Sequence, residues 1–119
     1  MKVIYSLEDD QDIAKIIQVS LTKAGYEVMS YSTCREFMDA FEKKKPNMVL
    51  LDLMLPDASG MDVLKKIRSD SANRNVKAVI LSAKRMTMDK VEGLDSGADD
   101  YIEKPFDILE PVSYTHLTL

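Results

Sequence analysis

The sequence contains a single cysteine, Cys34, so no disulfide bond can form within the chain. It lacks an apolar run of membrane-spanning length, and its first apolar stretch meets acidic residues too soon for a signal peptide. A G-x-x-x-x-G-K-[S/T] loop is also absent, which argues against a nucleotide-binding switch. The net charge of −4 argues against a general nucleic-acid-binding surface. We therefore expect a soluble, cytoplasmic protein that makes no contact with membranes.

What the chain does contain is one domain's worth of alternating strand and helix patterns. Its 119 residues are 45% hydrophobic and 30% charged, which is enough to bury a core. Runs of β-branched and apolar residues predict strands at 2–7, 26–31, 47–53 and 76–83, with a short fifth strand within 99–105. Helical spacing of apolar residues fills the intervals, as in the set Ile13, Ile16, Ile17, Leu21 and Ala24, which Gly25 ends. Helices between consecutive strands predict an α/β fold with a parallel sheet covered on both faces.

Polar side chains follow the carboxyl ends of these strands, where open parallel α/β sheets carry their functional sites. They are Glu8, Asp9 and Asp10 after the first strand, Asp52 after the third, Ser82 after the fourth and Lys104 after the fifth. Clustered carboxylates repel one another, and a divalent cation that prefers oxygen ligands, Mg²⁺ or Mn²⁺, removes that conflict. With the cation present, Asp52 can attack phosphorus and form an aspartyl phosphate. Lys104 and Ser82 would then stabilise the transferred oxygens.

Each of these residues also has a purely structural interpretation. The acids between Glu8 and Asp12 could complement the dipole of the helix that follows them. Asp52 could simply begin a turn. The acids after the first strand, Asp52, Ser82 and Lys104 each stand at the end of a strand, and it is this combination that favours a functional site.

Four segments, "LEDD", "LLDLMLPDASGMDVLKKIR", "VILSAK" and "SGADDYIEKPF", resemble the receiver domain of two-component response regulators in their order and spacing. The likeness runs from residue 1 to about 110. It implies a doubly wound, flavodoxin-like, five-stranded parallel sheet in the order 2-1-3-4-5. It also implies Mg²⁺ as cofactor and phosphorylation by a sensor histidine kinase. The details "DLMLPD" and "ILSAK" are most similar to the winged-helix transcription-factor branch, which implies a DNA-binding output domain missing from this chain.

The resemblance implies a role for each matching residue. Asp52 corresponds to the phosphorylation site, and Glu8 and Asp9 to the acidic pair, with Asp9 a direct metal ligand. The carbonyl of Met54 would be a further metal ligand, and Lys104 the family's lysine. Ser82 and Tyr101 correspond to the two switch residues. Tyr5 and Ser6 depart from the pattern, since the first strand is usually aliphatic there, and we expect Ser6 to satisfy its hydroxyl locally.

These features predict a phosphorylation-dependent signalling switch. It would not be an enzyme in the ordinary sense, although it would catalyse its own aspartyl phosphorylation and dephosphorylation. The intact protein could form a homodimer through its last helix–strand–helix face. A phosphorylation-independent interaction module is the alternative, but such modules usually lose the acceptor, the acid pair or the lysine. A phosphatase of the haloacid dehalogenase type needs a second aspartate two residues after the nucleophile, where Met54 stands.

The last nine residues break the helical pattern that precedes them. Pro111 interrupts the helix that Ile108 and Leu109 begin. The segment "VSYTHL" is also the in-frame translation of a transposase adapter used in sequencing libraries. We therefore predict a receiver domain over 1–110 with an incomplete last helix, and a non-native tail over 111–119, in which His116 has no function. A natural but divergent C-terminus is the alternative.

Overall fold

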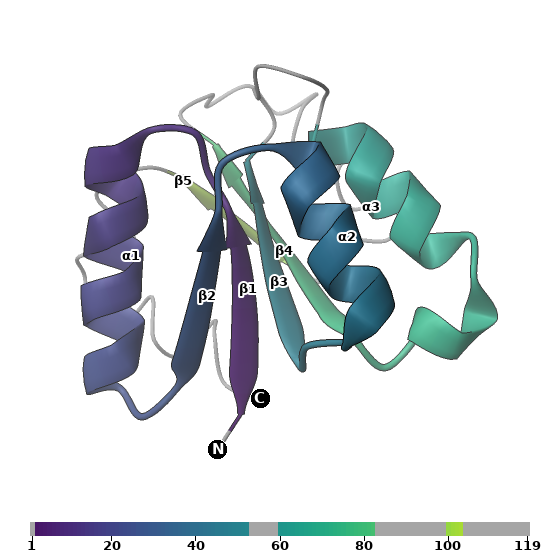
Figure 1. Ribbon diagram of the computed structural model, residues 1–119, viewed down its shortest axis with the longest axis horizontal. Coiled ribbons are helices and arrows are strands. Elements are labelled where there is room, and N and C mark those ends of the chain that lie inside the picture. Colours follow the sequence, from purple (N-terminus) through teal and green to yellow (C-terminus); the bar gives the residue numbers. More distant parts are fainter. Residues whose placement is uncertain (1, 53–59, 83–99, 104–119) are drawn as a thin grey trace.

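Strands and helices alternate along the part of the chain that the computed structural model describes, which is residues 2–52, 60–82 and 100–103 (Figure 1). In chain order these elements are β1 (Val3–Leu7), α1 (Gln11–Lys23), β2 (Glu27–Tyr31), α2 (Cys34–Lys43), β3 (Met48–Asp52), α3 (Gly60–Arg68), the 3₁₀ helix η1 (Ser71–Asn73), β4 (Lys77–Ser82) and β5 (Asp100–Glu103). The five strands lie where the sequence predicts them. The helices expected after β4 and after β5 lie outside the described residues.

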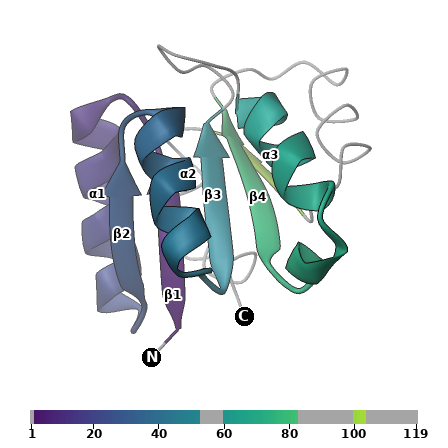
Figure 2. The same ribbon diagram turned by 45° about the vertical axis from the view of Figure 1, so that its right-hand side comes forward.

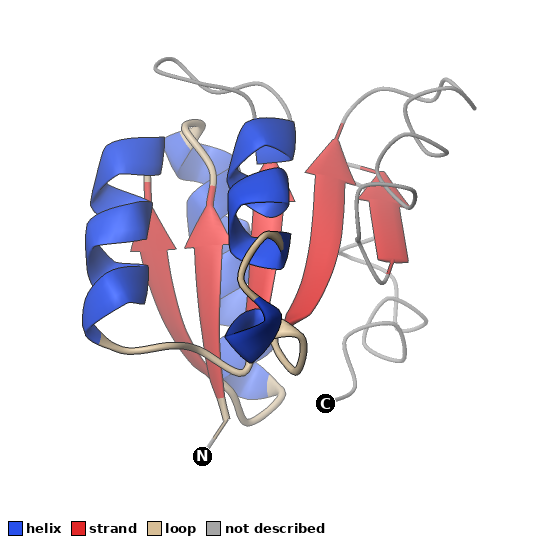
Figure 3. Cartoon of the chain, turned by 90° about the vertical axis from the view of Figure 1, so that its right-hand side faces the viewer, coloured by secondary structure: helices blue, strands red, loops and turns tan. Residues whose placement is uncertain are grey.

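The five strands form one parallel sheet in the order β2-β1-β3-β4-β5. Consecutive strands along the chain are joined by crossovers, so every carboxyl end reaches the same edge of the sheet, as the arrowheads in Figure 3 show. From β1 the chain adds β2 on one side and then β3 on the other, so β1 pairs with both strands. The predicted flavodoxin-like order is confirmed, and it places the ends of β1 and β3 side by side.

Each face of the sheet has its own hydrophobic core, because successive side chains of a strand point to opposite faces. Figure 2 shows α1 behind the sheet and α2 and α3 in front of it. The core under α1 contains Ile4, Ile17, Leu21, Val28, Met48, Leu50, Val79 and Leu81. The core under α2 and α3 includes Leu7, Phe37, Phe41, Val49, Leu51, Leu64, Ile67 and Ile80. Every residue of β3 is buried, which explains its uninterrupted apolar sequence up to Asp52.

The ends of α1 follow from two residues in the sequence. Asp10 accepts hydrogen bonds from the backbone N–H groups of Asp12 and Ile13, which is the arrangement of a helix N-cap. Gly25 has a φ of 99° and allows the N–H of Tyr26 to donate to the carbonyl of Leu21 at 3.1 Å. Ala24, expected on the buried face, is instead exposed, because the helix has already ended there and Ala24 is its C-cap.

Tyr5 and Ser6, the two polar residues of β1, differ in whether their hydroxyl groups form hydrogen bonds. Tyr5 packs edge-on against Tyr31 and Phe37, and its hydroxyl donates to the carbonyl of Lys44 at 2.7 Å. Ser6 is 1% exposed, and its hydroxyl has no hydrogen-bond partner within the described part of the chain. The expectation that Ser6 would satisfy its hydroxyl locally is therefore wrong there. Its position in the middle of a central strand, where the backbone groups are already paired, explains the absence of a local partner.

A helix that spans a membrane needs roughly 20 predominantly apolar residues. Among the described residues, no helix is long and apolar enough to cross a membrane.

Candidate functional site

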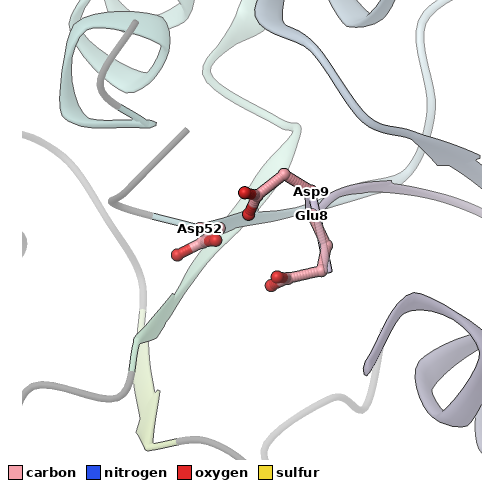
Figure 4. Close-up of side chains that lie close together, drawn as sticks. All are labelled: Glu8, Asp9 and Asp52. Atoms are coloured by element: carbon pink, nitrogen blue, oxygen red, sulfur yellow. The ribbon is translucent and has the colours of Figure 1, made fainter. Parts of the chain in front are cut away.

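Three carboxylates converge at the carboxyl edge of the sheet. Glu8, Asp9 and Asp52 each place one oxygen so that all three oxygens lie within 4.8 Å of one another. Figure 4 shows the three carboxylate groups facing a shared space, with Glu8 and Asp9 on one segment of the chain and Asp52 on another. Asp52 lies more than 40 residues after Glu8 and Asp9 in the sequence, so the order of the strands in the sheet brings it to them. Of the acids predicted after the first strand, Glu8 and Asp9 therefore meet Asp52.

The backbone around Glu8 and Asp9 is held in place by two hydrogen bonds. The N–H of Glu8 donates to the carbonyl of Tyr31 at 3.0 Å, so Glu8 still lies beside β2 although β1 has ended. The N–H of Asp10 donates to Oε1 of Glu8 at 3.1 Å. Asp52 is the last described residue of β3 and stands opposite Leu81 of β4 in the parallel ladder. The site is therefore built on sheet backbone on both sides.

Burial makes the cluster electrostatically unusual. Glu8 is 1% exposed and Asp52 is 3% exposed, whereas Asp9 is exposed to solvent. Ionised carboxylates are rarely buried unless they are paired or coordinate a metal. A divalent cation with oxygen ligands fits this donor set, since hard cations such as Mg²⁺ and Mn²⁺ prefer carboxylate oxygens. The exposed Asp9 gives such a cation a route from solvent.

The acids that follow β1 do not share one role. Asp10 uses its carboxylate as the N-cap of α1, and Asp12 lies in the first turn of that helix. The structural interpretation of the acidic run therefore holds for Asp10 and Asp12, while Glu8 and Asp9 face Asp52. The capping role of Asp10 has a recognisable signal, because aspartate is favoured immediately before an apolar-periodic helix.

The other predicted site residues are placed only in part. Ser82 is the last residue of β4, one position beyond the residue opposite Asp52, and its backbone pairs with Glu103. Tyr101 lies in β5 opposite Ile80. Met54 and Lys104 lie outside the described residues. The described chain therefore brings together Glu8, Asp9 and Asp52, and it brings the backbone of Ser82 to the same edge.

Known proteins match this chain over nearly its whole length. The family model for the response regulator receiver domain matches residues 4–113. Response regulator ArlR of Staphylococcus aureus is 39% identical over 110 residues, which are 92% of this chain and 49% of ArlR. The chain thus spans about half the length of the curated relatives it matches.

Solved structures share the fold. The receiver domain of Francisella response regulator 1452 is 28% identical with a TM-score of 0.86, over 98% of this chain and 95% of that one. The BeF3-activated N-terminal receiver domain of RstA from Klebsiella pneumoniae is 28% identical with a TM-score of 0.82, over 97% of this chain and 96% of that one.

Proposed function

The chain belongs to the family of response regulator receiver domains, and on that premise we propose that it accepts a phosphoryl group on Asp52 from a sensor histidine kinase. Membership in the family establishes a two-component signalling protein. Which residues carry the phosphorylation is our proposal, and one observation carries it. Asp52 ends a buried strand with one carboxylate oxygen within 4.8 Å of oxygens of two further carboxylates, an arrangement that is costly for ionised groups unless a cation or ligand compensates for it.

The proposed metal is Mg²⁺, held by Glu8, Asp9 and Asp52. The three oxygen donors support a hard divalent cation, and the carbonyl of Met54 would add the further ligand that the resemblance implies. When bound, the cation would neutralise the carboxylates and the oxygens of the incoming phosphoryl group. Mg²⁺ usually keeps several waters and takes few carboxylates, so we expect the exposed Asp9 to bind directly and the buried Glu8 to act mainly through water.

The chemistry proposed for Asp52 is nucleophilic attack. One oxygen of its carboxylate forms a bond to phosphorus, while the bond from phosphorus to the nitrogen of the donor's phosphohistidine breaks and that nitrogen takes up a proton. The ammonium of Lys104 would balance the negative charge of the three phosphoryl oxygens, and the hydroxyl of Ser82 would donate a hydrogen bond to one of them. The position of Ser82, one residue past the neighbour of Asp52 on the adjacent strand, supports this role.

We propose that the phosphoryl group then selects one of two conformations. Ser82 would move toward the phosphoryl group and Tyr101, two strand positions before Glu103, would turn into the space that Ser82 leaves. A ligand changes such an equilibrium only by its difference in affinity for the two states, so the hydrogen bond to Ser82 would be the source of that difference. The receiver domain of RstA, which this chain resembles, has been solved in a BeF3-activated form.

The partners follow from the same family. We propose that the domain controls a DNA-binding output domain outside these 119 residues, because the chain matches only 49% of ArlR and its motifs resemble the winged-helix branch. Dimerisation through the last helix–strand–helix face and a cytoplasmic location are further proposals made on the family. We also propose that residues 111–119 are a non-native tail. Re-sequencing the source locus tests this, and a genomic reading frame that continues through "PVSYTHLTL" would contradict it.

The experiment that tests the function is intact-mass analysis after incubation with acetyl phosphate, with and without Mg²⁺. We expect a mass increase of one phosphoryl group only when Mg²⁺ is present, and no increase in Asp52→Asn. Asp62→Asn, which removes an exposed carboxylate of α3, is the matched control and should be phosphorylated normally. Phosphate on Asp9 or Asp10 in the wild-type protein would overturn the assignment. A protein that takes up no phosphate from acetyl phosphate or from a kinase would favour the phosphorylation-independent module.

A further inference from the structure

We propose that Asp10 positions the metal-binding carboxylates of this domain by capping α1, and that it does not bind the cation itself. The inference rests on the proposed metal site of Glu8, Asp9 and Asp52. Asp10 is the third acid of the "EDD" run, and from the sequence alone it would be grouped with the metal ligands. The inference gives it a different role.

The side chain of Asp10 is already committed to the helix. Its Oδ1 accepts the N–H of Asp12 at 3.0 Å and the N–H of Ile13 at 3.2 Å. These are two of the four N–H groups that the first turn of a helix leaves without an intrahelical partner. The three carboxylates that converge in the described chain are Glu8, Asp9 and Asp52, and Asp10 is not one of them.

The backbone of Asp10 performs a second task. Its N–H donates to Oε1 of Glu8 at 3.1 Å, which fixes one oxygen of a carboxylate that is 1% exposed. A hydrogen bond to a carboxylate oxygen is one of the stronger kinds, because the acceptor is charged. The direction of this N–H depends on the extended conformation of Asp10, with φ of −78° and ψ of 112°, which is the conformation that the cap requires.

The two tasks are linked through one residue. Loss of the capping oxygen would release the first turn of α1, and with it the constraint on the backbone of Asp10. The N–H of Asp10 would then no longer hold Glu8, and Asp9, the residue between them, would lose its fixed direction. Groups that orient metal ligands through hydrogen bonds typically contribute tenfold or more to metal affinity, so the effect is measurable.

The test compares Mg²⁺ affinity, measured by titration calorimetry, among variants that separate capping from charge. Asp10→Ala removes both, and we expect its dissociation constant for Mg²⁺ to rise about tenfold. Asp10→Asn keeps a capping oxygen but loses the charge. Asp12→Asn, in the first turn of the same helix, loses the same charge but keeps the capping side chain of Asp10 and the backbone N–H that donates to it. We expect Asp10→Asn to bind Mg²⁺ as Asp12→Asn does, with far higher affinity than Asp10→Ala.

A second control separates positioning from a general loss of stability. Thr33 caps α2 by accepting the N–H of Glu36 at 3.2 Å, and α2 also begins at the carboxyl edge of the sheet. Thr33→Ala should lower the urea midpoint of unfolding about as much as Asp10→Ala does, because both remove an N-cap, but it should leave Mg²⁺ affinity unchanged.

Three results would overturn the inference. Equal loss of affinity in Asp10→Asn and Asp10→Ala would mean that the charge of Asp10 binds the cation. Unchanged affinity in Asp10→Ala would mean that the cap does not position the ligands, and equal loss in Thr33→Ala would mean that any lost cap has this effect. If the wild-type protein binds no divalent cation, the inference fails together with the proposed metal site, whereas the first three results leave that site standing.

Discussion

Replacing Asp52 with asparagine should make the protein more stable when divalent cations are absent. The side chain is 3% exposed and places an oxygen within 4.8 Å of the carboxylates of Glu8 and Asp9. Folding brings these three charges together, whereas the unfolded chain keeps Asp52 far from the other two. The substitution removes one charge from the cluster at nearly constant shape, so the free energy of unfolding should rise.

The size of the effect can be worked from the geometry. Two unit charges 4.8 Å apart repel by about 3.5 kcal/mol at an effective dielectric constant of about 20. Asp52 has two such neighbours, but Asp9 is exposed and water screens its share. An ammonium close to Asp52, which the resemblance implies for Lys104, would offset a further part. We therefore expect Asp52→Asn to add roughly 1–3 kcal/mol to the free energy of unfolding.

The assay is urea unfolding of the wild-type protein and of Asp52→Asn in EDTA and in excess MgCl₂. In Mg²⁺ the wild type should gain stability by mass action, about 2.7 kcal/mol at a hundred times the dissociation constant, and the advantage of the variant should shrink or reverse. Asp39→Asn, which removes an exposed acid from α2, should change the free energy of unfolding by less than about 0.5 kcal/mol. If Asp52→Asn is less stable than the wild type in EDTA, attraction rather than repulsion dominates around Asp52, and the reasoning is refuted.

Three further predictions follow from the site and the core. Asp9→Ala should weaken Mg²⁺ binding more than Glu8→Ala in a calorimetric titration, because the exposed acid is the proposed direct ligand; the reverse order would contradict the ligand roles. Ser82→Ala should still be phosphorylated, but phosphorylation of this variant should leave the NMR signals of Tyr101 unchanged. If phosphorylation of the wild-type protein also leaves the Tyr101 signals unchanged, the proposed switch is ruled out. Ser6→Ala should raise the urea midpoint of unfolding by removing a buried hydroxyl that has no partner in the described chain, a gain of about 1 kcal/mol; a lower midpoint would show that the hydroxyl is satisfied.

Much of the fold can be predicted from the sequence because each strand carries an unambiguous pattern. The strand β3 is buried on both faces and therefore reads as a continuous apolar run that stops at Asp52. Gly25 ends α1 because only a residue that tolerates positive φ fits there. Helices between consecutive strands then predict a parallel α/β sheet, while the strand order that sets the carboxyl ends of β1 and β3 side by side is implied by the resemblance to receiver domains. The convergence of Glu8 and Asp9 with Asp52 follows from this topology.

What could not be predicted depends on distances of a few ångströms. Four of the five residues from Glu8 to Asp12 are acidic, and the direction of each side chain in the structure separates the carboxylates that face Asp52 from the one that caps α1. Likewise, helical spacing places Ala24 on the buried face, but the helix ends one residue too early for that face to continue. That the hydroxyl of Ser6 finds no partner within the described ranges depends on what surrounds a central strand, which no local pattern encodes.

The placement of all three carboxylates within the first 52 residues has a consequence for how the protein is made. A ribosome synthesises β1, β2 and β3 before any residue of α3, β4 or β5, and the pairings of β1 with β2 and β3 need no later strand. We expect the cation-binding half of the site to assemble on the nascent chain ahead of Ser82. A cation bound to these carboxylates would then stabilise the pairing of β1 with β3 before β4 is made.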